Sequence, residues 1–178
     1  MAKTRIAPTP SGFLHAGNAF NFLVTDRLAK ATGSRLVLRI DDLDAGRTRP
    51  EYIEDVFYSL EWLGIRVDEG PSGPDDFHAN WTQHLRMPRY LGTTEVLLSR
   101  GALYPCSCSR PQLEALSRAN HPCRTQPNGA VPQGTPWRLR IPEPSSVPVM
   151  ELDGTTVQHD LATQMPDPVV LQRDSGRP

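Results

Sequence analysis

The chain has 178 residues, with 19 basic and 20 acidic side chains and a formal net charge of −1. This length allows one ordinary domain, or a core domain with a small insertion, and excludes a large multidomain enzyme. The charge balance excludes binding to nucleic acid through an overall basic field, so we expect no DNA partner and only local contacts with any RNA.

The first third of the chain alternates between strand and helix patterns. Thr4–Ala7 predicts a short strand, and a helix follows from Ala16 to about Thr32, with Gly33 as its stop. The apolar residues spaced for one face of that helix are Ala16, Phe20, Leu23, Val24 and Leu28. Arg35–Ile40 then predicts a mostly buried strand that ends in an acidic run.

A second helix is predicted from Pro50 to the glycine at position 64. Its apolar face consists of Ile53, Val56, Phe57, Leu60 and Leu63. Strands and helices in this order favour a parallel α/β sheet, in which ligands bind at the carboxyl ends of the strands. Residues 8–12 and 41–46 form the two loops at such ends.

The amino-acid composition of the chain changes after Pro105. We expect Pro71–Phe77 to be a loop and Pro88–Arg100 to be a helix that ends at Gly101. Beyond these, prolines become frequent, and short strand-like pieces appear at Trp137–Ile141, Val149–Leu152 and Val169–Gln172. We interpret residues 106–165 as an insertion with a small antiparallel element, in which Asp153-Gly154 is the expected hairpin turn.

The start of the first predicted helix has the features of a phosphate-binding site. A helix amino terminus behind a glycine-containing loop offers unpaired N–H groups and the positive end of the helix dipole. Gly17 leaves room for a flat ring or a phosphate, and His15 can hydrogen-bond a phosphate oxygen. Taken alone, these residues also fit a capped helix start with an incidental histidine.

Several motifs together resemble the catalytic domain of class I glutamyl-tRNA synthetases, and most of all the short glutamyl-Q tRNA(Asp) synthetase type. They are Arg5–Gly12, Leu14–Asn18, Leu38–Asp44, Glu61–Ile65, Asp68–Pro71 and, more thinly, Tyr104–Arg110 and Val169–Gly176. The resemblance implies a Rossmann-like α/β fold with an inserted zinc-type element. We expect residues 1–105 to form a half-domain that binds nucleotide and amino acid, residues 106–165 the insertion, and residues 166–178 a strand that returns to the core.

The resemblance also implies an activity. A glutamyl-tRNA synthetase uses ATP and Mg²⁺ to convert glutamate to glutamyl-adenylate and then transfers the glutamate to tRNA, here tRNA(Glu) or tRNA(Asp). His15 and Asn18 would be the catalytic residues. The ATP-binding residues would be Thr9, His15, Gly17 and Asn18. Asn18 stands where many class I synthetases have a second histidine, so it can donate a hydrogen bond but adds no charge.

Glutamate would be bound by Arg5, Ala7, Thr9 and Asp41. A guanidinium matches a carboxylate with two parallel hydrogen bonds, which favours Arg5 for the side chain of the substrate. Without the motif, Arg5 would be read as a surface arginine near the terminus. Asp41 would pair with the substrate ammonium, at a position where the family usually has glutamate.

Two further acids follow the second strand. We expect Asp42 and Asp44 to position the neighbouring loop or to pair with Arg47 and Arg49. The alternative is a Mg²⁺ site, since Mg²⁺ prefers a few carboxylates together with phosphate and water.

The cysteines form a second constellation. In the glutamyl-Q type a Cys-x-Cys pair followed by Tyr-x-x-x-Cys can hold a structural zinc, and here Ala119 occupies the tyrosine place. Three thiolates and an imidazole, from Cys106, Cys108, Cys123 and His121, would satisfy tetrahedral zinc. The alternative is free, partly buried thiols, since an odd number of cysteines argues against a disulfide scaffold.

The strand-like piece Trp137–Ile141 carries two arginines. Its aromatic and basic residues could meet the acceptor end of a tRNA, and a solvated arginine face explains the alternation equally well.

Members of the family continue through a Lys-Met-Ser-Lys-Ser type loop, whose lysine supports the leaving pyrophosphate. Lys3 and Lys30 are the only lysines here, so we expect an amino-terminal piece of a longer protein. Without the lysine of that loop, the reaction of this piece alone should be slower by about 10²-fold or more. One alternative is a nucleotidylyltransferase of the H-x-G-H type, and another is a non-catalytic fragment that binds ATP or glutamate. Met1–Arg5 does not resemble a secretory signal and no apolar run could cross a bilayer, so we expect a cytoplasmic protein without a membrane partner.

Overall fold

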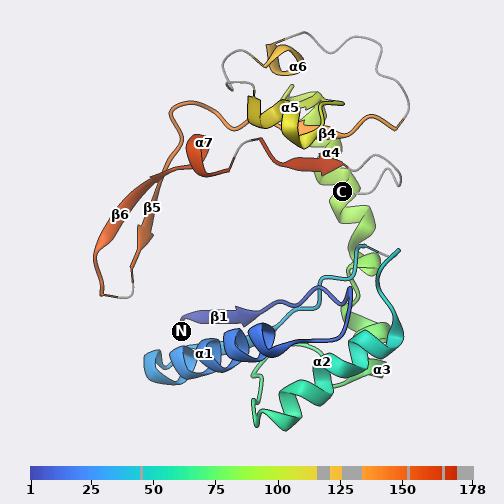
Figure 1. Ribbon diagram of the computed structural model, residues 1–178, viewed down its shortest axis with the longest axis vertical. Coiled ribbons are helices and arrows are strands. Elements are labelled where there is room, and N and C mark those ends of the chain that lie inside the picture. The colour runs from blue at the N-terminus through green and yellow to red at the C-terminus, as the bar shows by residue number, and fades with distance from the viewer. Residues whose placement is uncertain (45, 116–120, 126–133, 152, 166, 172–178) are drawn as a thin grey trace. The chain divides into compact units, whose positions relative to one another are not determined.

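The computed structural model describes residues 1–44, 46–115, 121–125, 134–151, 153–165 and 167–171. The chain forms two compact units, Met1–Met87 and Pro88–Pro178 (Figure 1). The position of Ala119 and most of the expected returning strand, residues 172–178, lie outside the described residues. The expected boundaries at residues 105 and 165 stay a prediction. No helix in the described part of the chain is both long and apolar enough to cross a bilayer.

A parallel pair of strands forms the sheet of the first unit. β1 (Lys3–Ile6) lies beside β2 (Arg35–Leu38) in an unbroken register. The pairing continues past the strand ends, because the N–H of Asp41 donates to the carbonyl of Pro8 at 2.9 Å. The predicted parallel α/β arrangement is confirmed, and the loops after the two strands start side by side.

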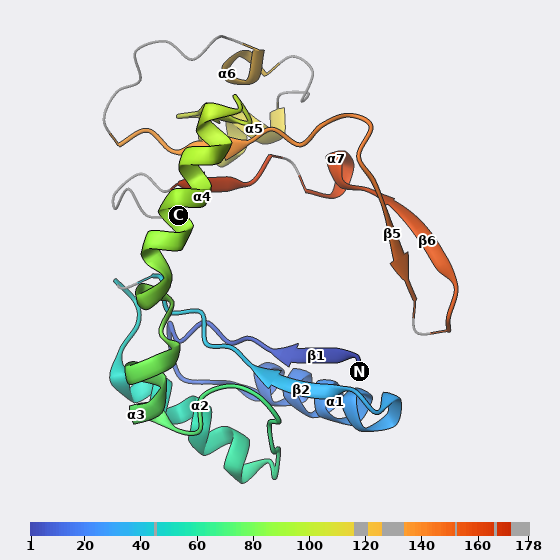
Figure 2. The ribbon, with the colours of Figure 1, turned by 180° about the vertical axis from the view of Figure 1, so that it is seen from behind.

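Two helices build one core on one face of this sheet. α1 (Ala16–Thr32) and α2 (Pro50–Trp62) both lie on the same side of the strands (Figure 2). The buried apolar side chains of this core are Ile6, Phe22, Ala29, Leu36, Leu38, Ile40, Ile53, Val56, Leu60, Ile65 and Phe77. The predicted apolar face of α2 is confirmed. Because side chains alternate along a strand, that of Arg5 points to the other face of the sheet and is exposed.

The predicted apolar face of α1 is wrong except for Leu23, which packs against the core, although the bounds of the helix are those predicted. The helix buries Phe22, Asp26 and Ala29. The side chains of Phe20, Val24 and Leu28, which the spacing places in the core, are 70%, 41% and 38% exposed. Both sides of this helix carry apolar residues, so periodicity alone could not choose between them. The buried Asp26 forms an ion pair with Lys30 at 2.7 Å, and this pair lowers the free-energy cost of burying the carboxylate.

The expected loop Pro71–Phe77 contains a short helix instead. α3 (Pro74–Asp76) leads into a π-helical turn, η1 (Phe77–Trp81), and a 3-10 turn, η2 (Gln83–Arg86). The carboxylate of Asp76 accepts from the N–H of Ser72 at 2.8 Å, and this bond lowers the pKa of Asp76. A buried Phe77 anchors the turn, so capping and burial together override the loop-like composition.

We expect Gly70→Ala to destabilise the first unit by about 3 kcal/mol or more. Gly70 has φ of +126°, a region that side chains rarely adopt, and an added Cβ would lie 2.5 Å from the carbonyl oxygen of Leu38. Urea unfolding followed by tryptophan fluorescence in a Trp137→Phe background would measure the loss. Gly73→Ala is the matched control, because Gly73 has an extended φ of 177° and no atom within 4 Å of its added Cβ. Equal losses in the two variants would contradict the prediction.

The second unit is built around a small antiparallel sheet. α4 (Met87–Ser99) leads to β3 (Leu103–Pro105), which pairs with β4 (Trp137–Leu139). β4 pairs in turn with β7 (Val169–Leu171), the described part of the expected returning strand. The helix α4 ends as predicted at Gly101, which adopts the left-handed conformation with φ of 64°.

The rest of the second unit consists of short helices and a hairpin. β5 (Ser146–Met150) and β6 (Thr156–Asp160) pair with each other, and the turn between them contains Asp153-Gly154 as predicted. The short helices are α5 (Arg110–Ala115), α6 (Pro122–Thr125) and α7 (Leu161–Gln164). The predicted antiparallel element is therefore confirmed.

Candidate active site and candidate metal centre

His15 is the N-cap residue of α1. Its Nδ1 accepts from the N–H of Gly17 at 3.1 Å, and its own N–H donates to Oδ1 of Asn18 at 3.1 Å. These two bonds form a reciprocal capping box, in which His15 takes the place that serine or threonine usually has. An added Cβ at Gly17 would lie 3.0 Å from Cε1 of His15, so a glycine there lets the ring fold back onto the helix.

The cap determines what the imidazole can offer a ligand. Because Nδ1 of His15 accepts a hydrogen bond, the neutral ring carries its proton on Nε2. The side chain of His15 is exposed, so this Nε2–H is a donor available to an anion at the helix amino terminus. The same geometry therefore fits both a structural role of His15, as the cap of the helix, and a functional role, as a donor to a phosphate.

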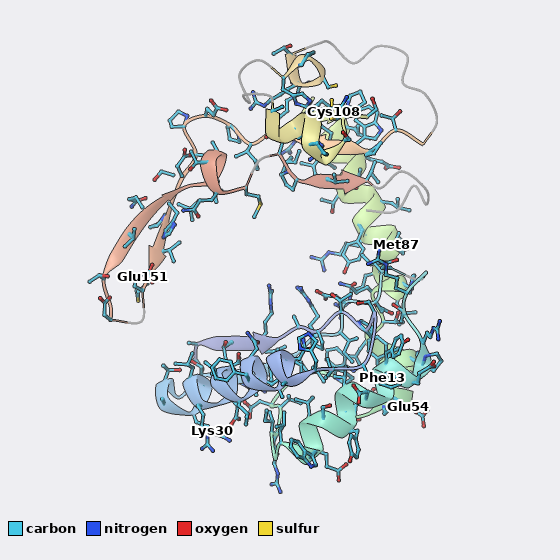
Figure 3. The ribbon with its side chains drawn as sticks, viewed as in Figure 1. Phe13, Lys30, Glu54, Met87, Cys108 and Glu151 are labelled. Carbon is cyan, nitrogen blue, oxygen red and sulfur yellow. The ribbon has the colours of Figure 1, made fainter. Side chains whose placement is uncertain are left out.

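The loop before α1 is held against α2. The N–H of Leu14 donates to Oδ2 of Asp55 at 2.7 Å. The ring of Phe13, which is labelled in Figure 3, meets that of Tyr52 edge-on, with 5.0 Å between centroids. Sequence analysis missed Asp55, which it could have noticed as a polar residue between the apolar positions of an amphipathic helix.

Three basic side chains on the face of the sheet opposite to the helical core have partners. Lys3 and Arg35 each pair with Glu69 at 2.7 Å, and the hydrogen bond from Lys3 lowers the pKa of Glu69. Arg39 forms a two-pronged pair with Asp41. In contrast, the guanidinium of Arg5 has no ion pair or side-chain hydrogen bond with any residue that the structure describes. The charge of Arg5 is therefore not neutralised by any described side chain.

Asp41 lies at the edge where the expected glutamate site would be. Its two oxygens accept from Nε and Nη2 of Arg39 at 2.6 and 2.8 Å. A third donor, Nε2 of Gln83, lies 3.3 Å from Oδ1. The backbone bond from Asp41 to Pro8 brings this carboxylate next to the loop of Ala7 and Thr9. Arg39 and Gln83 are site residues that sequence analysis missed.

Asp42 positions a loop, as expected. It is buried and accepts from the hydroxyl of Thr82 and, at 2.8 Å, from the N–H of Gln83. Asp44 pairs with Arg47 at 3.5 Å on the surface. Neither acid belongs to a cluster of three or more metal-ligating side chains among the described residues, and the alternative Mg²⁺ site, which would also need phosphate and water, stays a prediction.

The four predicted metal ligands come together in the second unit. The ligand atoms of Cys106, Cys108, His121 and Cys123 all lie within 4.8 Å of one another, and Cys108 is labelled in Figure 3. Sγ of Cys108 lies 3.8 Å from Sγ of Cys123, and Sγ of Cys106 lies 3.6 Å from Nε2 of His121. A tetrahedral zinc ion would separate two sulfurs by roughly 3.8 Å and a sulfur from a nitrogen by roughly 3.5 Å. The cluster therefore fits a metal ion.

Burial shifts the pKa values of two of these ligands, Cys108 and His121. It raises the pKa of Cys108 to about 11, with a further rise from the neighbouring thiols. It also lowers the pKa of His121, as do the charges of Arg138 and Arg124. The imidazole is therefore neutral and able to ligate, whereas the thiol of Cys108 would lose its proton only to a bound cation.

The arginines of the Trp137–Ile141 segment are engaged within the unit. Arg138 donates to the carbonyl of Asp167 at 2.9 Å, and Arg140 donates to the carbonyl of Arg124 and lies over the ring of Tyr104. Both arginines are half-buried and bonded within the unit, so a fully solvated arginine face does not describe them, and a contact of this segment with tRNA stays a prediction.

Comparisons with known proteins agree with the motifs. Residues 1–135 match the family described as tRNA synthetases class I (E and Q), catalytic domain. A glutamyl-Q tRNA(Asp) synthetase of Symbiobacterium thermophilum is 41% identical over 154 residues, which are 85% of this chain and 45% of the relative. One of Nitratidesulfovibrio vulgaris is 40% identical over 124 residues, which are 68% of this chain and 37% of the relative.

Glutamate–tRNA ligases are similar over a longer stretch. That of Polaromonas naphthalenivorans is 30% identical over 189 residues, covering 99% of this chain and 39% of the relative. The crystal structure of glutamate-tRNA synthetase from Elizabethkingia anophelis matches with a TM-score of 0.62 and 25% identity, covering 99% of this chain and 40% of that chain. The chain thus spans 37% to 45% of the length of these relatives.

Proposed function

Because the chain belongs to the family of class I tRNA synthetases for glutamate and glutamine, we propose that its first unit binds ATP and glutamate for the synthesis of glutamyl-adenylate. The glutamate would then pass to a tRNA, either tRNA(Glu) or tRNA(Asp). In the first step an oxygen of the α-carboxylate attacks the α-phosphorus of ATP. A new P–O bond forms, the bond to the β-phosphate breaks, and pyrophosphate leaves with the negative charge.

His15 and Asn18 would serve this leaving group. The cap on α1 supports the assignment, since it leaves the Nε2–H of His15 as a donor beside the helix amino terminus. Asn18 uses Oδ1 in the cap and retains its amide N–H groups as donors. Gly17 and Thr9 would border the nucleotide, and Mg²⁺ bound to ATP would neutralise further phosphate charge.

Arg5 would bind the side-chain carboxylate of glutamate. The observation that carries the proposal is that the guanidinium of Arg5 has no ion pair within the described part of the chain, whereas Lys3, Arg35 and Arg39 are paired. A free guanidinium at the carboxyl end of a parallel strand can grip a carboxylate with two hydrogen bonds, and this sets the preference for an acidic amino acid.

Asp41 would receive the ammonium group of the substrate, with Ala7 and Thr9 beside it. Its side chain is one methylene shorter than the glutamate usual in the family. Arg39 and Gln83 hold the carboxylate from one side, which fixes its direction and reduces the freedom lost on binding.

A structural zinc would sit in the second unit, held by Cys106, Cys108, His121 and Cys123. The fit of the two measured ligand separations to a tetrahedral ion supports it. Zinc there would crosslink two segments whose paired ligands are 15 residues apart, with no part in the transfer of glutamate.

We expect glutamate to stimulate exchange of pyrophosphate into ATP, and calorimetry to detect binding of both ATP and glutamate. These assays separate the candidate functions. Exchange that depends on a phosphorylated small molecule, and not on glutamate, would favour the nucleotidylyltransferase. Binding of both ligands without exchange would select the non-catalytic reading for this chain, and no binding of glutamate would overturn the proposal.

A further inference from the structure

The metal cluster of the second unit rests on a buried polar network. Tyr104, His121 and Asp167 are 1%, 4% and 4% exposed. Such groups are costly to bury unless each polar atom has a partner, so their arrangement reports which atom donates and which accepts.

Asp167 is the centre of this network. Its Oδ2 accepts from the hydroxyl of Tyr104 at 2.9 Å and from Nε of Arg124 at 2.8 Å. Its Oδ1 accepts from the N–H of Ile141 at 3.0 Å. A carboxylate can only accept, so the single proton of the Tyr104 hydroxyl is directed at Asp167.

This direction leaves the oxygen of Tyr104 as an acceptor toward His121. The oxygen lies 3.5 Å from Nδ1 of His121, a long hydrogen bond, and the two rings meet edge-on with 5.8 Å between centroids. An acceptor beside Nδ1 favours the tautomer with the proton on that nitrogen. The lone pair then lies on Nε2, which faces Sγ of Cys106 at 3.6 Å.

We propose that Tyr104 and Asp167 are positioning residues for the metal centre, which hold His121 as the Nδ1–H tautomer and aim its Nε2 at the ion. The inference rests on the proposed metal site. It assigns a role to two residues that are not ligands, and it links the centre to the strands, because Tyr104 belongs to β3 and Asp167 precedes β7. Outer partners of this kind set the orientation and basicity of a ligating imidazole.

The tautomer can be measured directly. We expect nitrogen NMR of the Zn²⁺-loaded parent chain to show the proton of the His121 ring on Nδ1 and the metal on Nε2. A proton on Nε2 would overturn the inference, and this measurement needs no variant that might fail to fold. A purely structural role of Tyr104 would not select one tautomer over the other.

Metal affinity gives the second test. We expect Tyr104→Phe, which keeps the ring and removes only the hydroxyl, to weaken Zn²⁺ binding by about 10- to 100-fold in competition with a chelator. The visible spectrum of bound Co²⁺ should shift in the same variant. Tyr58→Phe is the matched control, since Tyr58 is 66% exposed in the first unit. Unchanged affinity in Tyr104→Phe would overturn this inference alone, whereas a parent chain that binds no Zn²⁺ would overturn the metal site as well.

Discussion

A strong chelator is expected to unfold the Pro88–Pro178 unit and to leave the Met1–Met87 unit folded. The reason is the size of the two cores. Among the described residues of the second unit, the buried apolar side chains are only Leu103, Tyr104, Cys106 and Ile141. So small a core seldom folds without a crosslink, and a structural zinc supplies an apparent ~10 kcal/mol or more near neutral pH.

Fluorescence can follow each unit separately. The chain has three tryptophans, of which only Trp137 lies in the second unit. In a Trp62→Phe, Trp81→Phe background, chelation should shift the emission of Trp137, and added Zn²⁺ should restore it. Since each thiol that binds must release its proton, the affinity should fall by about tenfold per thiol for each unit of pH below neutrality.

The control for metal removal is Cys108→Ser, which should give an emission that the chelator no longer changes. Elemental analysis of the purified parent chain should find about one zinc per chain. Identical unfolding curves with and without chelator would show that the four side chains do not hold a stabilising ion.

The second large effect is expected at the substrate carboxylate. Arg5→Ala should weaken glutamate binding by about 100-fold, or roughly 3 kcal/mol, because the variant leaves a carboxylate without its two-pronged partner. ATP binding should stay within about twofold, since Arg5 takes no part in the hydrogen bonds that cap α1. Isothermal calorimetry with each ligand measures both quantities.

Arg27→Ala is the matched control for this prediction. Arg27 is an exposed arginine of α1, so its removal changes the net charge by the same amount at a position away from the strand ends. Equal loss of glutamate binding in the two variants would indicate a general effect of charge. Unchanged binding in Arg5→Ala would refute the assignment of Arg5.

Local signals in the sequence predicted most of the first unit. The apolar run of β2 and the Pro50 start of α2 depend on neighbouring residues only, and both elements form as predicted. The buried face of α1 could not be predicted, because Phe20 and Phe22 offer equivalent stripes on opposite sides of the helix. The cap at His15 and the sheet decide which stripe is buried.

The supporting residues of both sites were harder to foresee. Gln83 reaches Asp41 because Asp42 fixes the turn around Thr82, an arrangement of residues about 40 positions apart. Asp167 likewise contacts Tyr104 across 63 positions. Neither pairing leaves a periodic or local trace in the chain, whereas the ligand-type residues themselves were recognisable from their motifs.

The double use of His15 has a consequence for how variants of this chain should be interpreted. Its imidazole caps the amino terminus of a 17-residue helix and also carries the Nε2–H proposed to donate to a phosphate. Loss of that ring would fray the helix and remove the donor together, so a slower reaction would report a mixture of damage to architecture and to chemistry. An asparagine in its place would keep the cap but, being shorter, would place no donor at the position of Nε2, and so would separate the two.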